Sequence, residues 1–309
     1  MLATANSYYF MTIALLLNGL GFGLLDNSKY SYFSQTDTAE RQSAIAACNS
    51  GGSSGAFCGL IAGAFLATTL SYNQVFWSAV FIDLIVLLMC IYLGNKVLIK
   101  TNENNDEKSI STFKFLFSKS VWPYLLLLTV GFGVISGFIC YYVPIYCNDN
   151  KFDEKQVALL LLIFSLCTTF LSVPLTKSLN RLFKKKSVYL SILLSLFALL
   201  IISNFNNLYI LVAGIFFMGI AQSFGVNVLM TYFTENKICE KYGKSNTTGV
   251  YSLTLGIGGA ISSTGFSSII SSGFALNMWI FSGVIFLALL LYIIFFDKKF
   301  KNKSVIKQK

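Results

Sequence analysis

Long apolar stretches separated by short polar loops dominate the chain. They lie at residues 8–25, 44–70, 75–94, 121–143, 157–175, 187–203, 208–233, 245–268 and 276–296. Most are about 20 residues long, which is the length that a helix needs to cross roughly 30 Å of hydrocarbon. They also lack the strict alternation of apolar and polar residues that barrel strands show. The pattern predicts an all-α fold, a polytopic membrane helix bundle with about nine transmembrane helices.

The chain also repeats itself, at an offset of about 200 residues. Each copy has a long apolar segment, a polar loop with an acid-base pair, a Gly/Ser-rich apolar segment and a third apolar segment opened by Trp. Such an offset is too long for a solenoid and fits the two homologous halves of a membrane transporter. The matching positions are Gly19 and Gly219, Tyr32-Phe33 and Tyr232-Phe233, Glu40-Arg41 and Glu240-Lys241, Trp77 and Trp279, and Asn95-Lys96 and Asp297-Lys298.

Composition and charge agree with a membrane protein. Hydrophobic residues make up 55% of the chain and charged residues only 12%, which excludes a soluble protein. Of the 23 Lys and Arg residues, 21 lie in one alternate set of loops, and only Lys151 and Lys155 lie in the other. The positive-inside rule therefore predicts a multi-pass protein of the cell membrane with residues 95–120 and the C-terminus in the cytoplasm and the N-terminus outside. Because the basic residues serve this orientation, no nucleic-acid partner is expected.

Catalysis and metal binding find little support in the sequence. The chain has no His, and its seven Cys are scattered without a CxxC pair. Imidazole-based metal centres and catalytic triads are thereby excluded, and no disulfide framework can be argued. We expect no metal, no cofactor and no enzymatic activity.

Two weakened motifs resemble those of a known transporter family. In residues 44–70, Gly55, Gly59, Leu60, Gly63 and Ala64 are similar to an antiporter signature of Gly, three residues, Gly-Pro, two residues and Gly-Gly, without its Pro and last Gly. The loop after residue 175 is similar to a cytoplasmic G-x-L-x-D-R-x-G-R-K loop, without its Asp and both Gly. The corresponding residues are Thr176, Ser178, Asn180, Arg181, Phe183, Lys184, Lys185 and Lys186.

Together with the repeat, these motifs resemble the major facilitator superfamily, secondary transporters with two six-helix halves joined by a cytoplasmic loop. The resemblance implies a partial N-terminal bundle at 1–94, a cytoplasmic linker at 95–120, a complete six-helix bundle at 121–296 and a basic cytoplasmic tail at 297–309. The nine stretches would be family helices four to twelve, so three helices are expected to precede residue 1. A genuine nine-helix protein is the alternative.

The resemblance also implies a central cavity lined by the first, fourth and seventh stretches. Its candidate lining residues carry amides and hydroxyls and no cation, which suits a neutral or amphipathic organic solute. Polar residues in membrane helices also serve as contacts between helices, and this alternative stays open for each of them. The candidates are Asn18, Tyr141, Tyr142, Gln222, Ser223 and Asn227.

Two further features of the N-terminal part are candidates for function. Gly51, Gly55, Gly59 and Gly63 recur every four residues, so they share one helix face that fits close helix packing or a moving gate. Asp83 lies inside the third apolar stretch, where a carboxylate is costly. It is either a proton-coupling residue or a structural one.

The sequence therefore predicts a secondary active transporter of a small organic solute that works by alternating access. Its direction, including efflux, and its coupling ion stay open, as does its oligomeric state. Its expected partners are the lipid bilayer and the solute, with proton coupling as an option. A non-transporting membrane anchor, assembly or sensor module is the alternative.

Overall fold

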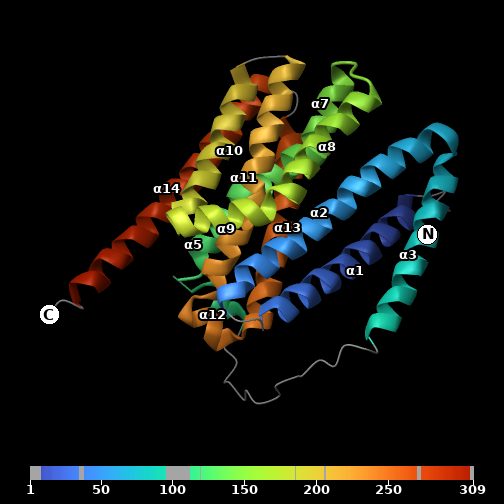
Figure 1. The fold of residues 1–309 in the computed structure, drawn as a ribbon. Helices are drawn as coiled ribbons and strands as arrows, with labels where there is room; N and C mark the ends of the chain where they lie inside the picture. Colours follow the sequence, from blue (N-terminus) through green and yellow to red (C-terminus); the bar gives the residue numbers. More distant parts are fainter. Residues whose placement is uncertain are drawn as a thin grey trace.

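The computed structural model describes residues 8–34, 38–94, 112–118, 120–184, 186–204, 207–269 and 273–306 (Figure 1). The described residues of the nine apolar stretches are helical except Leu70, Val121 and Leu171, which confirms the all-α prediction. The helices of the N-terminal part are α1 (Tyr8–Ser34), α2 (Thr38–Thr69) and α3 (Tyr72–Gly94). Those that follow are α4 (Thr112–Leu116), α5 (Trp122–Leu126), η2 (Leu127–Phe132), α6 (Gly133–Gly137), η3 (Phe138–Tyr142), α7 (Val143–Asp149), α8 (Glu154–Phe170), α9 (Ser172–Phe183), α10 (Lys186–Asn204), α11 (Leu208–Thr234), α12 (Lys237–Tyr242), α13 (Lys244–Ile269) and α14 (Phe274–Ile306).

Within the N-terminal part, α1 and α2 are the helices that contact the bundle formed by α5 to α14. Helix α1 lies along α13, and α2 packs against α8, α9 and α11. Helix α3 contacts α2 and lies at the outer edge of the molecule (Figure 1). Its apolar side chains are exposed along its length, for example Ile82 and Leu87. This is the surface expected of a helix that faces lipid.

By length and composition, five described helical segments can cross a membrane. The bent pair of α8 and α9 would be a sixth, and α1 contributes a shorter apolar helix at Tyr9–Gly21. Helices α2 and α13 are long enough but are not among these segments, because Gly, Ser and Thr dilute their apolar residues. The five are Asn73–Tyr92, Trp122–Asp149, Lys186–Ser203, Leu208–Thr234 and Phe274–Ile294.

The Trp122–Asp149 span is continuous but contains two π-helical segments, η2 and η3. Between them, α6 crosses α13 at very short range. A Cβ atom built on Gly133 would lie 2.6 Å from Gly258 Cα, and one built on Gly258 would lie 2.5 Å from the Thr129 carbonyl oxygen. The Ser262 hydroxyl donates to the Gly133 carbonyl at 2.9 Å. Only glycine allows two helix backbones to approach so closely, as in small-residue packing of membrane helices.

Two helices differ from the boundaries predicted by the sequence. The stretch 157–175 is not straight, because α8 and α9 meet at an angle of 56° near Leu171. Pro174 explains the break, since it lacks an N–H and its ring clashes with the carbonyl four residues earlier. At the other end of the chain, α14 continues to Ile306 through the segment predicted as a tail.

Candidate functional site

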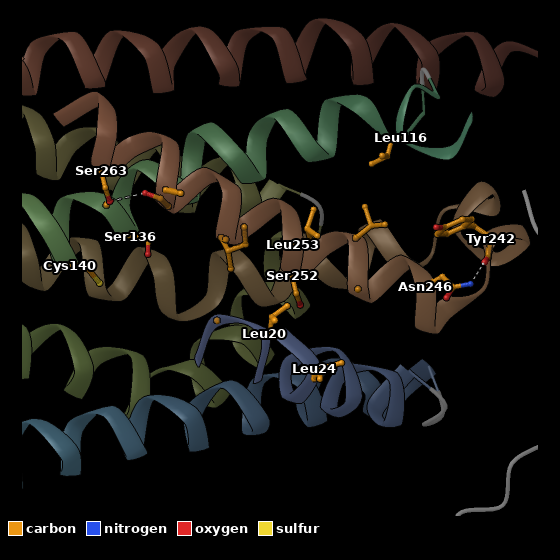
Figure 2. A pocket seen from close by; sticks show the side chains of 18 residues that line it. Leu20, Leu24, Leu116, Ser136, Cys140, Tyr242, Asn246, Ser252, Leu253 and Ser263 are labelled. Atoms are coloured by element: carbon orange, nitrogen blue, oxygen red, sulfur yellow. Dashed lines mark hydrogen bonds between the residues drawn. The ribbon is translucent and has the colours of Figure 1, made fainter. Parts of the chain in front are cut away.

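A cavity of about 950 Å³ lies between α1, α13 and the Trp122–Asp149 span, with α4 and α12 at one end. Figure 2 shows α13 and α1 facing each other across it. Most of its wall comes from α13, whose small residues recur every three or four positions and so share one helix face. The lining residues are Gly19, Leu20, Leu24, Leu116, Ser136, Gly137, Cys140, Tyr242, Asn246, Gly249, Val250, Ser252, Leu253, Leu255, Gly256, Gly259, Ala260 and Ser263.

Polar and apolar groups alternate along the cavity, with Ser252 among the leucines and Tyr242 and Asn246 at the end formed by α12. Ser136, Cys140 and Ser263 lie at one end, Leu116 and Leu253 follow, and α12 closes the other end (Figure 2). Ser263 is already satisfied within its helix, because its hydroxyl donates to the Gly259 carbonyl at 2.9 Å. The arrangement offers an apolar wall with a few hydrogen-bonding groups, as ligand pockets usually do.

Ser252 is the lining residue with an unsatisfied polar group. Its hydroxyl oxygen is buried and has no hydrogen-bond partner among the described residues, and it lies on the α1 side of α13 near Leu20 (Figure 2). A buried polar atom without a partner is costly, so a ligand group that bonds to it gains free energy. No described lining residue is charged. The described lining therefore offers no charged partner to a ligand.

The six residues predicted to line the cavity are not among the described residues that do so. Asn18 is exposed on α1. Tyr141 is half-buried, and the buried Tyr142 hydroxyl accepts a hydrogen bond from Asn277 at 3.1 Å. Gln222 is half-buried, and its Oε1 atom is buried without a partner in the part of the chain that the structure describes. Their assignment to a solute site stays a prediction.

Ser223 and Asn227 lie on the face of α11 that meets α2 and α9. The Ser223 hydroxyl donates to the Ile220 carbonyl at 2.6 Å. Asn227 is buried and accepts a hydrogen bond from Asn49 of α2 at 2.5 Å. Asn227 thus joins helices of the N-terminal part and of the bundle rather than facing the cavity.

The glycine face of α2 is open. No described atom lies within 4 Å of a Cβ built on Gly51, Gly55, Gly59 or Gly63. Helix α2 contacts the bundle instead through the face that carries Ala46 and its neighbours. A packing or gating role for the glycines stays a prediction, and within the described chain they have no packing partner.

Asp83 and the basic loop lie away from the cavity. The Asp83 side chain is exposed on α3. In the loop, Asn180 accepts a hydrogen bond from the Tyr232 hydroxyl at 2.7 Å, which ties α9 to the end of α11. Arg181, Lys184 and Lys186 are exposed, and the Lys185 side chain lies outside the described residues. Lys184 adopts a positive φ of 49° where α9 ends, a conformation that favours glycine.

Comparison with known families gives a decisive result. The family model of the Major Facilitator Superfamily matches residues 1–153 and again residues 148–309, so the two matches cover the whole chain. The chain belongs to the major facilitator superfamily. This confirms the resemblance drawn from the repeat and the motifs. No individual curated protein matched the chain.

Membership makes the chain a multi-pass membrane protein and a transporter of the major facilitator type. In this transporter the cavity is lined by α1 on one side and by α13 and the Trp122–Asp149 span on the other, and α1 also lies along α13. Sequence reasoning missed its polar residues, among them Ser136, Ser252 and Ser263. The signal that could have found two of them is the run of small residues in 245–268, which places Ser252 and Ser263 on the same face as Gly249, Gly256 and Gly259.

Proposed function

We propose that the protein is a secondary active transporter that moves an uncharged, amphipathic organic solute by alternating access and binds it in the cavity between α1 and α13. The observation that carries the proposal is a cavity of about 950 Å³ whose described lining has leucines, small residues and hydroxyls but no charged side chain. Its volume lies within the range of sites for small organic ligands, roughly 300–1,000 Å³. A phosphate or carboxylate solute would lack a cation to pair with.

The cavity extends toward α4 and α12, which belong to loops on the Lys-rich side of the chain. The positive-inside rule assigns that side to the cytoplasm, so the cavity faces the cytoplasm and the Asp149 end of the fourth span faces outside. Trp77 and Trp279 are both exposed, and the same rule places them at the outer membrane interface, where Trp is enriched.

Flux into liposomes tests the proposal. The purified chain is reconstituted, and uptake of a panel of uncharged amphipathic dyes is compared with uptake of organic phosphates, with and without a proton gradient. We expect at least one uncharged dye to enter faster than in protein-free liposomes, with saturation at high concentration. Equal flux with and without protein for every dye would favour the alternative of an anchor, assembly or sensor module. Faster uptake of a phosphate would contradict the solute class.

Replacing Asp83 by Asn is expected to leave gradient-driven uptake unchanged. The side chain is exposed on a helix that contacts α2 and does not line the cavity, so a structural role explains it better than proton coupling. Removing a carboxylate from the membrane lowers the insertion cost by a few kcal/mol at most on translocon scales. Uptake with and without a proton gradient is the measurement. If the variant lost accumulation against a gradient but still exchanged bound solute, Asp83 would be the coupling residue.

A further inference from the structure

Asn227 is the centre of a buried hydrogen-bond network that joins three helices. Its side chain is only 2% exposed. Its Oδ1 atom accepts from Asn49 Nδ2 of α2 at 2.5 Å. Its own Nδ2 atom lies 3.0 Å from the Ser172 hydroxyl of α9 and 2.8 Å from the Ser223 carbonyl of α11. One amide therefore holds α2, α9 and α11 together.

Helix α2 makes two more hydrogen bonds at the break between α8 and α9. The Ser172 hydroxyl donates to the Ala46 carbonyl at 3.2 Å, and the Ser50 hydroxyl donates to the Thr169 carbonyl. Thr169 and Ser172 lie on either side of the break. The last carbonyls of a helix have no partner inside it, so the end of α8 offers an acceptor that a continuous helix would not. Helix α2 is thus bonded to the point where the span bends.

The facing groups between α2 and α9 differ in chemistry from those between α1 and α13. There, the helices also lie side by side, but the residues of α1 and α13 that line the cavity are mostly leucines and small residues. Between α2 and α9, the facing groups are amides, hydroxyls and carbonyls within bonding distance, beside the fully buried Ile45 and Ala46. Hydrocarbon offers these groups no replacement partner, so they are either bonded to each other or solvated by water that enters when the helices part. Such a contact has two states, closed and open.

We propose that Asn49 and Asn227, with Ser172, form a latch that holds α2 against α9 and α11, and that the latch must open in each transport cycle. The second half of this statement rests on the proposed alternating-access function. Asn227 and Asn49 act as positioning residues, because neither is among the described residues that line the cavity. The latch sets how often α2 separates from α9 and leaves the chemistry of the solute site unchanged.

Distances between two spin labels test the latch. Cysteines are placed at Ser43 of α2 and Lys177 of α9, both exposed, in a version of the full chain whose seven native cysteines are replaced. The distance distribution is measured in nanodiscs. We expect Asn227→Ala to increase the population with the longer distance by a factor between roughly three and roughly twenty. Measured hydrogen-bond energies between membrane helices set this range. Asn49→Ala should give a similar shift, and the double variant no more than either single one.

Asn277→Ala is the matched control. Asn277 is also a fully buried asparagine, but it bonds to the Tyr142 hydroxyl within the bundle, so its loss should leave the label distance unchanged. An unchanged distribution in Asn49→Ala and Asn227→Ala, or an equal shift in Asn277→Ala, would overturn the latch. If Asn227→Ala does not fold, the half-buried Asn49 decides the outcome, since its truncation removes the same bond.

A parallel flux measurement separates the latch from the transport function. A change in label distance together with a changed rate of solute uptake supports the full proposal. A change in distance with wild-type uptake shows that latch opening is not a step of the cycle. If wild-type protein moves no solute at all, the distance data still establish the latch, and it is the proposed function that fails.

Discussion

Replacing Gly258 by alanine is expected to destabilise the protein by roughly 1–3 kcal/mol or more, the cost of overpacking a filled site. The new Cβ would lie 2.5 Å from the Thr129 carbonyl oxygen and 2.9 Å from Thr129 Cα. Both are backbone atoms of the Trp122–Asp149 span, so a side-chain rotation cannot relieve the clash, and α13 must move away. The midpoint of thermal unfolding in detergent, followed by tryptophan fluorescence, is the measurement.

Gly256→Ala is the control for this prediction. Gly256 lies two residues earlier on the same helix, and no described atom lies within 4 Å of a Cβ built there. Alanine is the better helix former by up to about 1 kcal/mol, so this variant should be as stable as wild type or slightly more stable. Equal stability of the two alanine variants would show that α13 does not cross the Trp122–Asp149 span as closely as described.

Replacing Gly256 by phenylalanine is expected to reduce solute uptake at least tenfold, which corresponds to about 1.4 kcal/mol of lost binding free energy. Gly256 lines the cavity, and the space beyond its Cβ position is open, so a phenyl ring fits there and occupies solute volume without distorting the backbone. Folding should therefore be preserved. Saturable uptake of whichever uncharged dye the wild type moves is the measurement.

The matched control is Gly283→Phe on α14. Gly283 is also an exposed helical glycine with open space at its Cβ position, but it is not among the described residues that line the cavity. Its replacement should leave uptake at the wild-type rate. If both phenylalanine variants reduced uptake equally, the effect would come from the membrane surface of the bundle, and the cavity would lose its assignment as the solute site.

The helices could be predicted from the sequence because a helix that crosses the bilayer needs about 20 mostly apolar residues. The break near Leu171 could not, because proline within a membrane helix is tolerated to a variable degree and Pro174 by itself fixes no angle. The extension of α14 to Ile306 was missed for a different reason. Lys-rich sequence marks where the membrane ends, but lysine is a good helix former and does not end the helix.

The candidate site was harder to predict because polarity within a span does not tell which neighbour a side chain meets. Asn227 was selected for its amide, and its amide does form an important contact, but with Asn49 rather than with the cavity. Conversely, Ser252 was overlooked among the many Ser and Thr residues of α13. What distinguishes it is a hydroxyl without a partner in the described structure, which depends on packing across helices far apart in sequence.

The low apolar content of α2 and α13 has a consequence for how the protein is made. Insertion from the translocon depends on the apolar content of each segment, and α3 meets that requirement alone while α2 and α13 do not reach it by composition. We expect α2 to enter the bilayer only after α3 has been synthesised, and α13 to enter it together with α14. Helix α2, which carries Asn49 of the latch, and α13, which forms most of the cavity wall, would then each depend on the following helix for insertion.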